Sequence, residues 1–126
     1  MTGEKVVGSP IACRAGYPAP MQTQGRLDAL MAMLARDPDD AFCLYGVAQE
    51  HAKADRLDEA IAWFGRVLAV EPTHAYAHFH LAKTLERSGR VPEAMQALRD
   101  GLAAARSAGD AKAANELAGY LDELSP

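Results

Sequence analysis

The chain has 126 residues, which corresponds to one domain with room for five or six helices and a modest core. Its formal net charge of -4 gives no positive field that would hold nucleic acid, and no run approaches the roughly 20 apolar residues that cross a bilayer. The two cysteines form no CxxC pair, so neither a disulfide framework nor a structural zinc site is indicated, and a reducing, cytoplasmic setting fits best.

Residues 1-23 are expected to form a disordered tail. Prolines and glycines interrupt any helix through residues 1-20. Two alternatives stay open for this segment. The short apolar stretch before Cys13 faintly resembles a bacterial lipoprotein signal, and Met21, where the helical pattern starts, is a candidate start of translation.

The first predicted helix spans residues 24-37. Its apolar side chains recur at spacings of three and four and so share one helical face; they are Leu27, Leu30, Met31 and Leu34. Asp37 and Pro38 end the helix, because a proline disfavours helical geometry in the residue before it.

Five further helices are predicted from the same periodicity and from turn signals. Their approximate ranges are 40-54, 57-70, 75-87, 92-105 and 111-124. Asp39 and Thr73 are expected to cap the second and fourth helices, and Gly89 is expected to close the fourth in a left-handed conformation. Pro92 suits the first turn of the fifth helix, where its missing amide costs nothing.

Two successive segments, 41-74 and 75-108, repeat one pattern with a period of 34 residues. Seven identities recur at this shift: Ala41 with Ala75, Ala48 with Ala82, Arg56 with Arg90, Glu59 with Glu93, Ala60 with Ala94, Leu68 with Leu102 and Ala69 with Ala103. A period of this length is typical of stacked helix pairs, in which each unit buries its apolar face only against its neighbours.

The pattern resembles the tetratricopeptide repeat, TPR, in a small bacterial-type form. In the first unit the family's packing positions hold Leu44, Val47, Ala48, Ala60, Phe64, Val67 and the closing Pro72. In the second they hold His78, Leu81, Ala82, Ala94, Leu98, and then Gly101 and Arg106, which replace the usual alanine and proline. The resemblance implies an all-α, TPR-like repeat solenoid over 24-124: two full repeats, a preceding half-repeat helix and a capping helix at 111-124.

In such a stack the first helix of each unit lines a concave groove. Carried over from the family, the groove residues of this chain are Phe42, Tyr45, Gln49, Lys53, Tyr76, Phe79, His80, Lys83 and Arg87. Four of the seven Phe and Tyr residues lie in this set, beside three cations. Aromatic side chains flanked by cations suit a peptide or helix that carries acidic or C-terminal carboxylate groups.

The chain is therefore expected to be a small cytoplasmic adaptor or assembly scaffold that binds a protein segment. Tyr45 and Gln49 stand where the family's chaperone clamp has lysine and asparagine, which disfavours that particular partnership. The alternative is a homodimer that buries the groove aromatics or Trp63.

The sequence predicts neither an enzyme nor a cofactor. It contains no phosphate-binding loop and no nucleophile with a plausible base, and Cys43 has no basic neighbour that would lower its pKa. The histidines are the only candidate metal cluster, and no metal is expected because they occupy capping and packing positions or point apart; they are His51, His74, His78 and His80.

Overall fold

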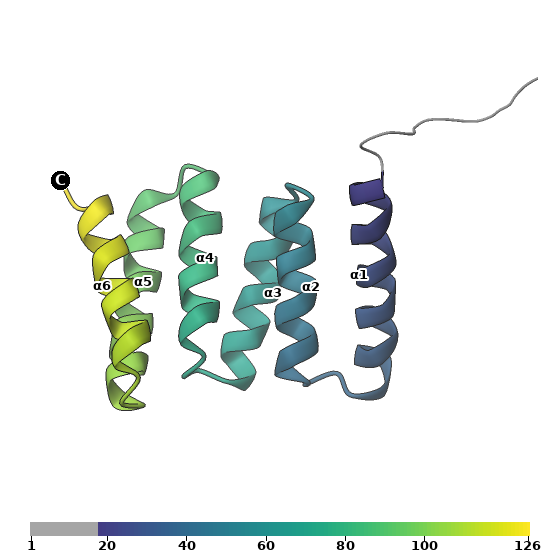
Figure 1. Ribbon diagram of the computed structural model, residues 1–126, viewed down its shortest axis with the longest axis horizontal. Coiled ribbons are helices and arrows are strands. Elements are labelled where there is room, and N and C mark those ends of the chain that lie inside the picture. Colours follow the sequence, from purple (N-terminus) through teal and green to yellow (C-terminus); the bar gives the residue numbers. More distant parts are fainter. Residues whose placement is uncertain (1–17) are drawn as a thin grey trace, which may run out of the picture.

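The computed structural model describes the backbone of residues 18–126, with side chains from Gly25 onward. Over this range the chain forms the helices α1 (Pro18–Arg36), α2 (Ala41–Lys53), α3 (Leu57–Val70), α4 (Ala75–Arg87), α5 (Val91–Ser107) and α6 (Ala111–Leu124). Consecutive helices pack side by side in one row, from α1 at one end to α6 at the other (Figure 1). Because α2 also contacts α4 and α4 contacts α6, the first helices of successive units share a face. The fold is an all-α helical repeat solenoid, as the sequence predicted.

Helix α1 begins at Pro18, six residues before its expected start, so residues 18–23 belong to a helix and not to a tail. The helix starts earlier because Pro18 and Pro20 both lie in its first turn. Backbone amides in the first turn have no hydrogen-bond partner within the helix, so proline, which lacks an amide hydrogen, is tolerated there. The rest of the expected tail, 1–17 with its Cys13 signal, lies outside the described residues.

Two caps lie one residue later than predicted. Asp40, and not Asp39, caps α2, and its Oδ1 accepts from the amides of Phe42 at 3.0 Å and Cys43 at 3.3 Å. His74, and not Thr73, caps α4 through its Nδ1, which accepts from an amide three residues on. A capping side chain reaches the second and third helical amides only from the position directly before the helix, which is why the earlier residues do not serve.

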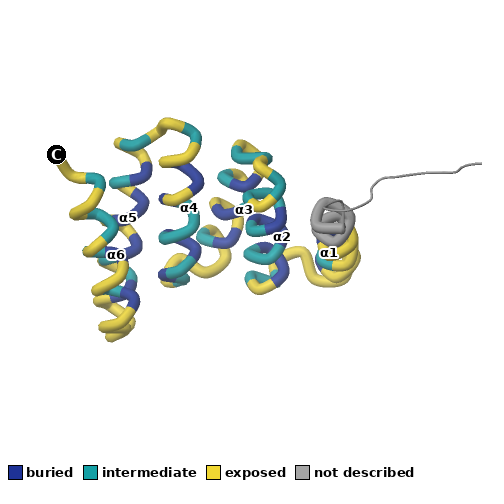
Figure 2. The backbone as a smooth tube through the Cα atoms, turned by 45° about the horizontal axis from the view of Figure 1, so that its top comes forward, coloured by how far each residue is buried: buried dark blue, intermediate teal, exposed yellow. Residues whose placement is uncertain are grey.

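The apolar positions that define the repeat form the core. Phe64, Leu44 and Leu98 are among the largest side chains that are fully buried, together with Val47 and Val67. Most buried positions lie along the inner sides of α2 to α5 (Figure 2). Among the described residues, α1 adds only Leu27 and Leu34 to the core, and α6 adds only Ala113 and Leu117. Each unit therefore buries its apolar face against the next unit, as expected of stacked helix pairs.

Helix α5 continues to Ser107, beyond the expected end at residue 105. The first unit closes with Pro72, but its counterpart Arg106 permits helical geometry, so the helix goes on. As a result α5 is three residues longer than α3, while the connection that follows is one residue shorter. This shifts α6 by two residues relative to the 34-residue period and determines which of its side chains face α4.

Candidate functional site

A continuous row of aromatic rings crosses the face that is lined by α2, α4 and α6, which we call the groove. The Tyr45 ring of α2 lies 5.9 Å from the His80 ring of α4, between ring centroids. His80 lies 5.5 Å from Phe79, and Phe79 lies 5.4 Å from Tyr120 of α6. We call these four rings the aromatic row. It connects the three first helices in a single strip of ring surface.

Two rings of the row, Tyr45 and His80, are half-buried and pack on residues beneath them. Tyr45 packs edge-on to the buried Phe64 ring at 6.0 Å and lies 4.7 Å from the capping His74. Burial, followed by the nearby Tyr76, raises the pKa of Tyr45. Burial also lowers the pKa of His80, with the charges of Lys83 and His74 acting in the same direction. At neutral pH the row therefore presents uncharged rings.

The three groove cations predicted from the sequence already have partners in the molecule. Lys53 donates to Glu50, whose side chain is only 2% exposed, at 3.3 Å. Arg87 donates to Asp55 at 2.6 Å and to the carbonyl oxygen of Ala52 at 3.2 Å, and so fastens α4 to the end of the preceding α2. The ammonium of Lys83 lies 5.7 Å from the centroid of the Phe79 ring. The contacts of Lys53 and Lys83 are made within their own helices, three and four residues away, whereas the sequence pattern does not reveal the pairing of Arg87, which joins α4 to the turn after α2.

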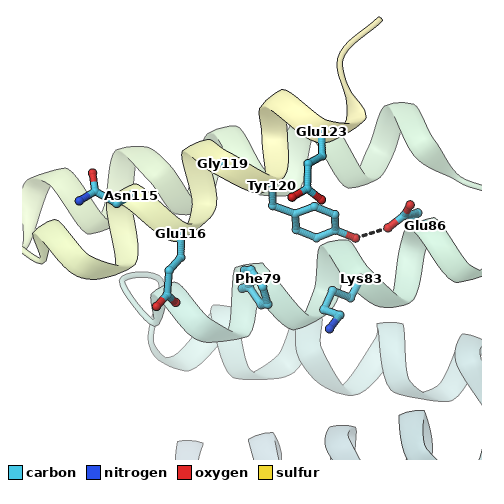
Figure 3. Close-up of a pocket in the computed structure, with 8 residues that line it drawn as sticks. All are labelled: Phe79, Lys83, Glu86, Asn115, Glu116, Gly119, Tyr120 and Glu123. Carbon is cyan, nitrogen blue, oxygen red and sulfur yellow. Dashed lines mark hydrogen bonds between the residues drawn. The ribbon is translucent and has the colours of Figure 1, made fainter.

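The aromatic row ends in an open pocket between α4 and α6, with a volume of about 480 Å³ (Figure 3). It is lined by Phe79, Lys83, Glu86, Asn115, Glu116, Gly119, Tyr120 and Glu123. The Tyr120 hydroxyl donates a hydrogen bond to Glu86 and so connects the two helices across the pocket. Burial, together with this bond and the charge of Glu123, raises the pKa of Tyr120.

The lining residues from α6 do not follow from the sequence pattern, which predicts this helix only as a cap. The signal that would have found them is the spacing of the helix caps. Asp40 and His74 are 34 residues apart, whereas His74 and Asp110 are 36 apart. In the shifted register Asn115 and Gly119 correspond to Phe79 and Lys83, two of the predicted groove positions.

The nine predicted groove residues differ in their exposure and in what they contact. Phe79 and Lys83 line the pocket, and Tyr45 and His80 belong to the aromatic row. Phe42 has 75% of its surface exposed, whereas Tyr76 packs against the core. Gln49 is half-buried. The remaining two, Lys53 and Arg87, are exposed cations with the acidic partners described above.

In the part of the chain that the structure describes, His74 and His80 both lie beside the Tyr45 ring, whereas His51 and His78 have other partners. The Nε2 atom of the largely buried His78 lies 3.1 Å from the carbonyl oxygen of Pro72, and His51 accepts from Arg56 at 2.9 Å. Within residues 18–126 no group of three or more histidine, cysteine, aspartate or glutamate side chains is arranged to hold a metal ion.

Trp63 and Cys43, which the sequence analysis also considered, are packed within the molecule. Trp63 is half-buried, stacks on His51 at 6.3 Å and is covered by the guanidinium of Arg66 at 4.3 Å. Cys43 is a free, fully buried thiol, and burial and the charge of Asp40 raise its pKa, which suits a packing residue. Within residues 18–126 no helix has both the length and the apolar composition that crossing a membrane requires.

Comparison with known proteins agrees with this architecture. A family model described as tetratricopeptide repeat matches residues 51–118. A TPR repeat-containing protein of Pseudomonas aeruginosa is 28% identical over 98 residues, which cover 78% of this chain and 93% of that protein.

The fold is also similar to those of solved structures. A Bordetella parapertussis protein is 34% identical, with a TM-score of 0.69 over 78% of this chain and 85% of that one. The TPR2B domain of yeast Sti1, solved as a complex with pHsp70, is 19% identical, with a TM-score of 0.76 over 86% of each chain, and shares the fold. The family model covers more than half of this chain, and the chain belongs to the tetratricopeptide repeat family.

Proposed function

We propose that the groove binds a segment of a partner protein, as an extended peptide or a helix, and that the chain acts as a small, non-catalytic cytoplasmic adaptor or assembly scaffold. The observation that carries this proposal is the aromatic row from Tyr45 to Tyr120, whose neighbouring rings lie 5.4 to 5.9 Å apart. Tyrosine and phenylalanine give a large contact area at a small cost in side-chain entropy, which is why aromatic residues are enriched where proteins bind each other.

The placement of the row suits a bound segment. It runs across α2, α4 and α6, so a segment lying along it contacts all three helices at once. Phe42, with 75% of its surface exposed, adds a further apolar contact at the α2 end. A domain of the same fold, the TPR2B domain of yeast Sti1, forms a complex with pHsp70, which supports a protein partner for this chain.

The groove cations were expected to favour acidic or C-terminal carboxylate groups on the partner. Lys53 and Arg87 are the side chains that would supply this preference in the α2 half of the groove. Each would have to share its charge with Glu50 or Asp55. An acidic partner group there would be held at the solvent-exposed edge, where an ion pair contributes only about 0.2–1 kcal/mol.

Capture from native lysate tests the proposal. The immobilised full chain is compared with Tyr45→Ala and Phe79→Ala, which each remove a ring of the aromatic row, and with Arg99→Glu, an exposed charge reversal on α5, outside the groove. The proposal expects a partner that the wild type and Arg99→Glu retain and that the groove variants lose. A set of partners retained equally by all four proteins would refute it.

Homodimerisation is the second candidate, and the exposure of Phe42 favours it specifically, together with Met31 and Met33 on α1, which are 42% and 48% exposed. A second copy that packs against α1 or the start of α2 would cover some of these side chains. Trp63 contributes less to this candidate, since His51 and Arg66 already cover it. Light scattering at micromolar concentration separates the two: a dimer that Phe42→Ser converts to a monomer supports self-association, and a wild-type monomer refutes it.

A further inference from the structure

The pocket between α4 and α6 differs in charge from the rest of the groove. Three carboxylates line it, those of Glu86, Glu116 and Glu123, against the single ammonium of Lys83. Among the described residues, Glu116 and Glu123 form no hydrogen bond or ion pair, and both are exposed. These two carboxylates are therefore free to pair with an incoming charge, and the excess of negative charge would repel an acidic group.

Two aromatic rings form the apolar part of the same pocket. Phe79 and Tyr120 approach each other from opposite helices, with their centroids 5.4 Å apart and their planes inclined by 56° (Figure 3). The bond from the Tyr120 hydroxyl to Glu86 fixes the tyrosine ring in place. A cation held between ring faces and carboxylates gains from both, because an aromatic face attracts positive charge.

The molecule itself shows that this surface accepts a cation. The Lys83 ammonium lies 5.7 Å from the centroid of the Phe79 ring, within the range of a cation–π contact. Lys83 is an exposed side chain on a flexible stem, so it is easily displaced by a side chain that enters from outside. The pocket thus combines a ring that already attracts an ammonium with two carboxylates that have no partner.

The α6 side of the pocket leaves room for a side chain of a partner. A Cβ built at Gly119, in the middle of the α6 lining, meets no atom within 4 Å. The volume of about 480 Å³ lies in the range of pockets that hold ligand groups. No steric barrier on the α6 side therefore opposes the entry of a long side chain.

We propose that the α4–α6 pocket receives an arginine or lysine side chain of the segment that the groove binds, with Glu116 and Glu123 pairing with its charge and Phe79 and Tyr120 packing against its stem or guanidinium. This inference rests on the function proposed above and names the chemistry of the partner at one end of the groove. Arginine fits best, because its planar guanidinium stacks on rings and pairs with carboxylates at the same time.

A titration with defined small probes tests the pocket without a known partner. The probes are Nα-acetyl-arginine amide, Nα-acetyl-lysine amide and Nα-acetyl-glutamate amide, added to the ¹⁵N-labelled full chain while amide chemical shifts are recorded. The arginine probe is expected to shift the amides of residues 79–86 and 115–123, with an affinity that falls at least threefold between 50 and 300 mM salt. The glutamate probe is expected to leave them unchanged.

Two sets of variants test separately the charge of the carboxylates and the free space in the pocket. Glu116→Gln combined with Glu123→Gln is expected to weaken the arginine probe at least fivefold, whereas Asp122→Asn, on α6 but outside the lining, is expected to leave it unchanged. Gly119→Leu is expected to block the pocket, whereas Gly65→Leu on α3, where a Cβ also meets no atom, is not. None of these changes removes a buried group, so all variants should fold.

Equal binding of the glutamate probe, shifts scattered over the whole chain, or no effect of the Glu116 and Glu123 changes would each overturn the inference. Its failure is distinct from failure of the proposed function. A chain that captures a partner through Tyr45 but ignores the arginine probe loses only the pocket assignment. A chain that binds the probe but retains its partners in every groove variant loses the proposed function.

Discussion

Gly101 of α5 lies directly against His78 of α4: a Cβ built at residue 101 would fall 2.5 Å from the Cβ and 3.0 Å from the Cγ of His78. The family pattern places an alanine where this chain has Gly101. The imidazole of His78 takes up that space, with its Nε2 at hydrogen-bonding distance from the Pro72 carbonyl oxygen. Residue 101 is therefore a glycine where the family has alanine because His78 fills the space of the missing side chain. This pair of residues allows α4 and α5 to pack closely.

Gly101→Ala should destabilise the chain, even though alanine is the better helix former by about 1 kcal/mol. His78 is buried and cannot move aside without disturbing the α4–α5 contact, and overpacking of this kind typically costs about 1–3 kcal/mol. We expect the free energy of unfolding to fall by about 1–2 kcal/mol in a urea titration.

The matched control for this change is Gly119→Ala, where the added Cβ meets no atom and the free energy of unfolding should rise by about 0.5–1 kcal/mol. The double variant Gly101→Ala with His78→Gly should lose less than the two single losses combined, because only glycine at 78 removes the Cβ that lies 2.5 Å from the added one. Additive losses would show that the two residues do not constrain each other.

Gly89 closes α4 with a φ of 83°, and Asp55, 34 residues earlier, closes α2 with a φ of 64°. Gly89→Ala should lower the free energy of unfolding by about 1 kcal/mol, because a Cβ is strained in the left-handed region. Gly89→Asn should cost less, because asparagine tolerates this conformation much as Asp55 does. Thermal or chemical unfolding checks the order glycine, asparagine, alanine, and an alanine variant as stable as the wild type would contradict it.

Stability should fall as the pH drops below about 6.5. Burial, with Lys83 and His74, lowers the folded-state pKa of His80 from its ordinary value of 6.5, so the unfolded chain takes up a proton at a higher pH than the folded chain. Between those two pKa values the unfolded state binds more protons, and the free energy of unfolding decreases with falling pH. Urea titrations at several pH values from 7.5 to 5 measure this slope.

His80→Gln should flatten part of the slope, although it also removes a ring of the aromatic row and lowers stability at every pH. Part of the slope should remain, because burial and the charge of Arg56 lower the pKa of His51 in the same direction. A slope that is identical in wild type and His80→Gln would show that His80 does not contribute.

The repeat allowed most of the fold to be predicted, because the 34-residue period determines both where helices lie and which of their faces are buried. Leu44, Val47 and Phe64 were assigned to the core from this register and are fully buried. The start of α1 was not predicted, because prolines were interpreted as helix breakers, whereas Pro18 and Pro20 lie in the first turn.

The candidate site was predicted in part. Tyr45, Phe79 and His80 follow from the repeat register, and the structure places their rings next to one another. The pocket was not predicted, because it depends on Tyr120 and its neighbours in α6, where the longer α5 changes the period. The pairing of Arg87 with Asp55 was missed as well, since it depends on how the end of α4 approaches a turn 32 residues earlier.

Photocrosslinking from the groove tests the central claim most directly. Benzoylphenylalanine replaces Phe42, whose ring is 75% exposed, so the substitution should leave the fold intact. The same group at Arg99 on α5 is the control. We predict that irradiation of cells yields an adduct with a different protein from position 42, that Tyr45→Ala reduces it, and that position 99 gives none. No adduct from position 42, or equal adducts from positions 42 and 99, would contradict groove binding, and an adduct only with a second copy of the chain would establish self-association in its place.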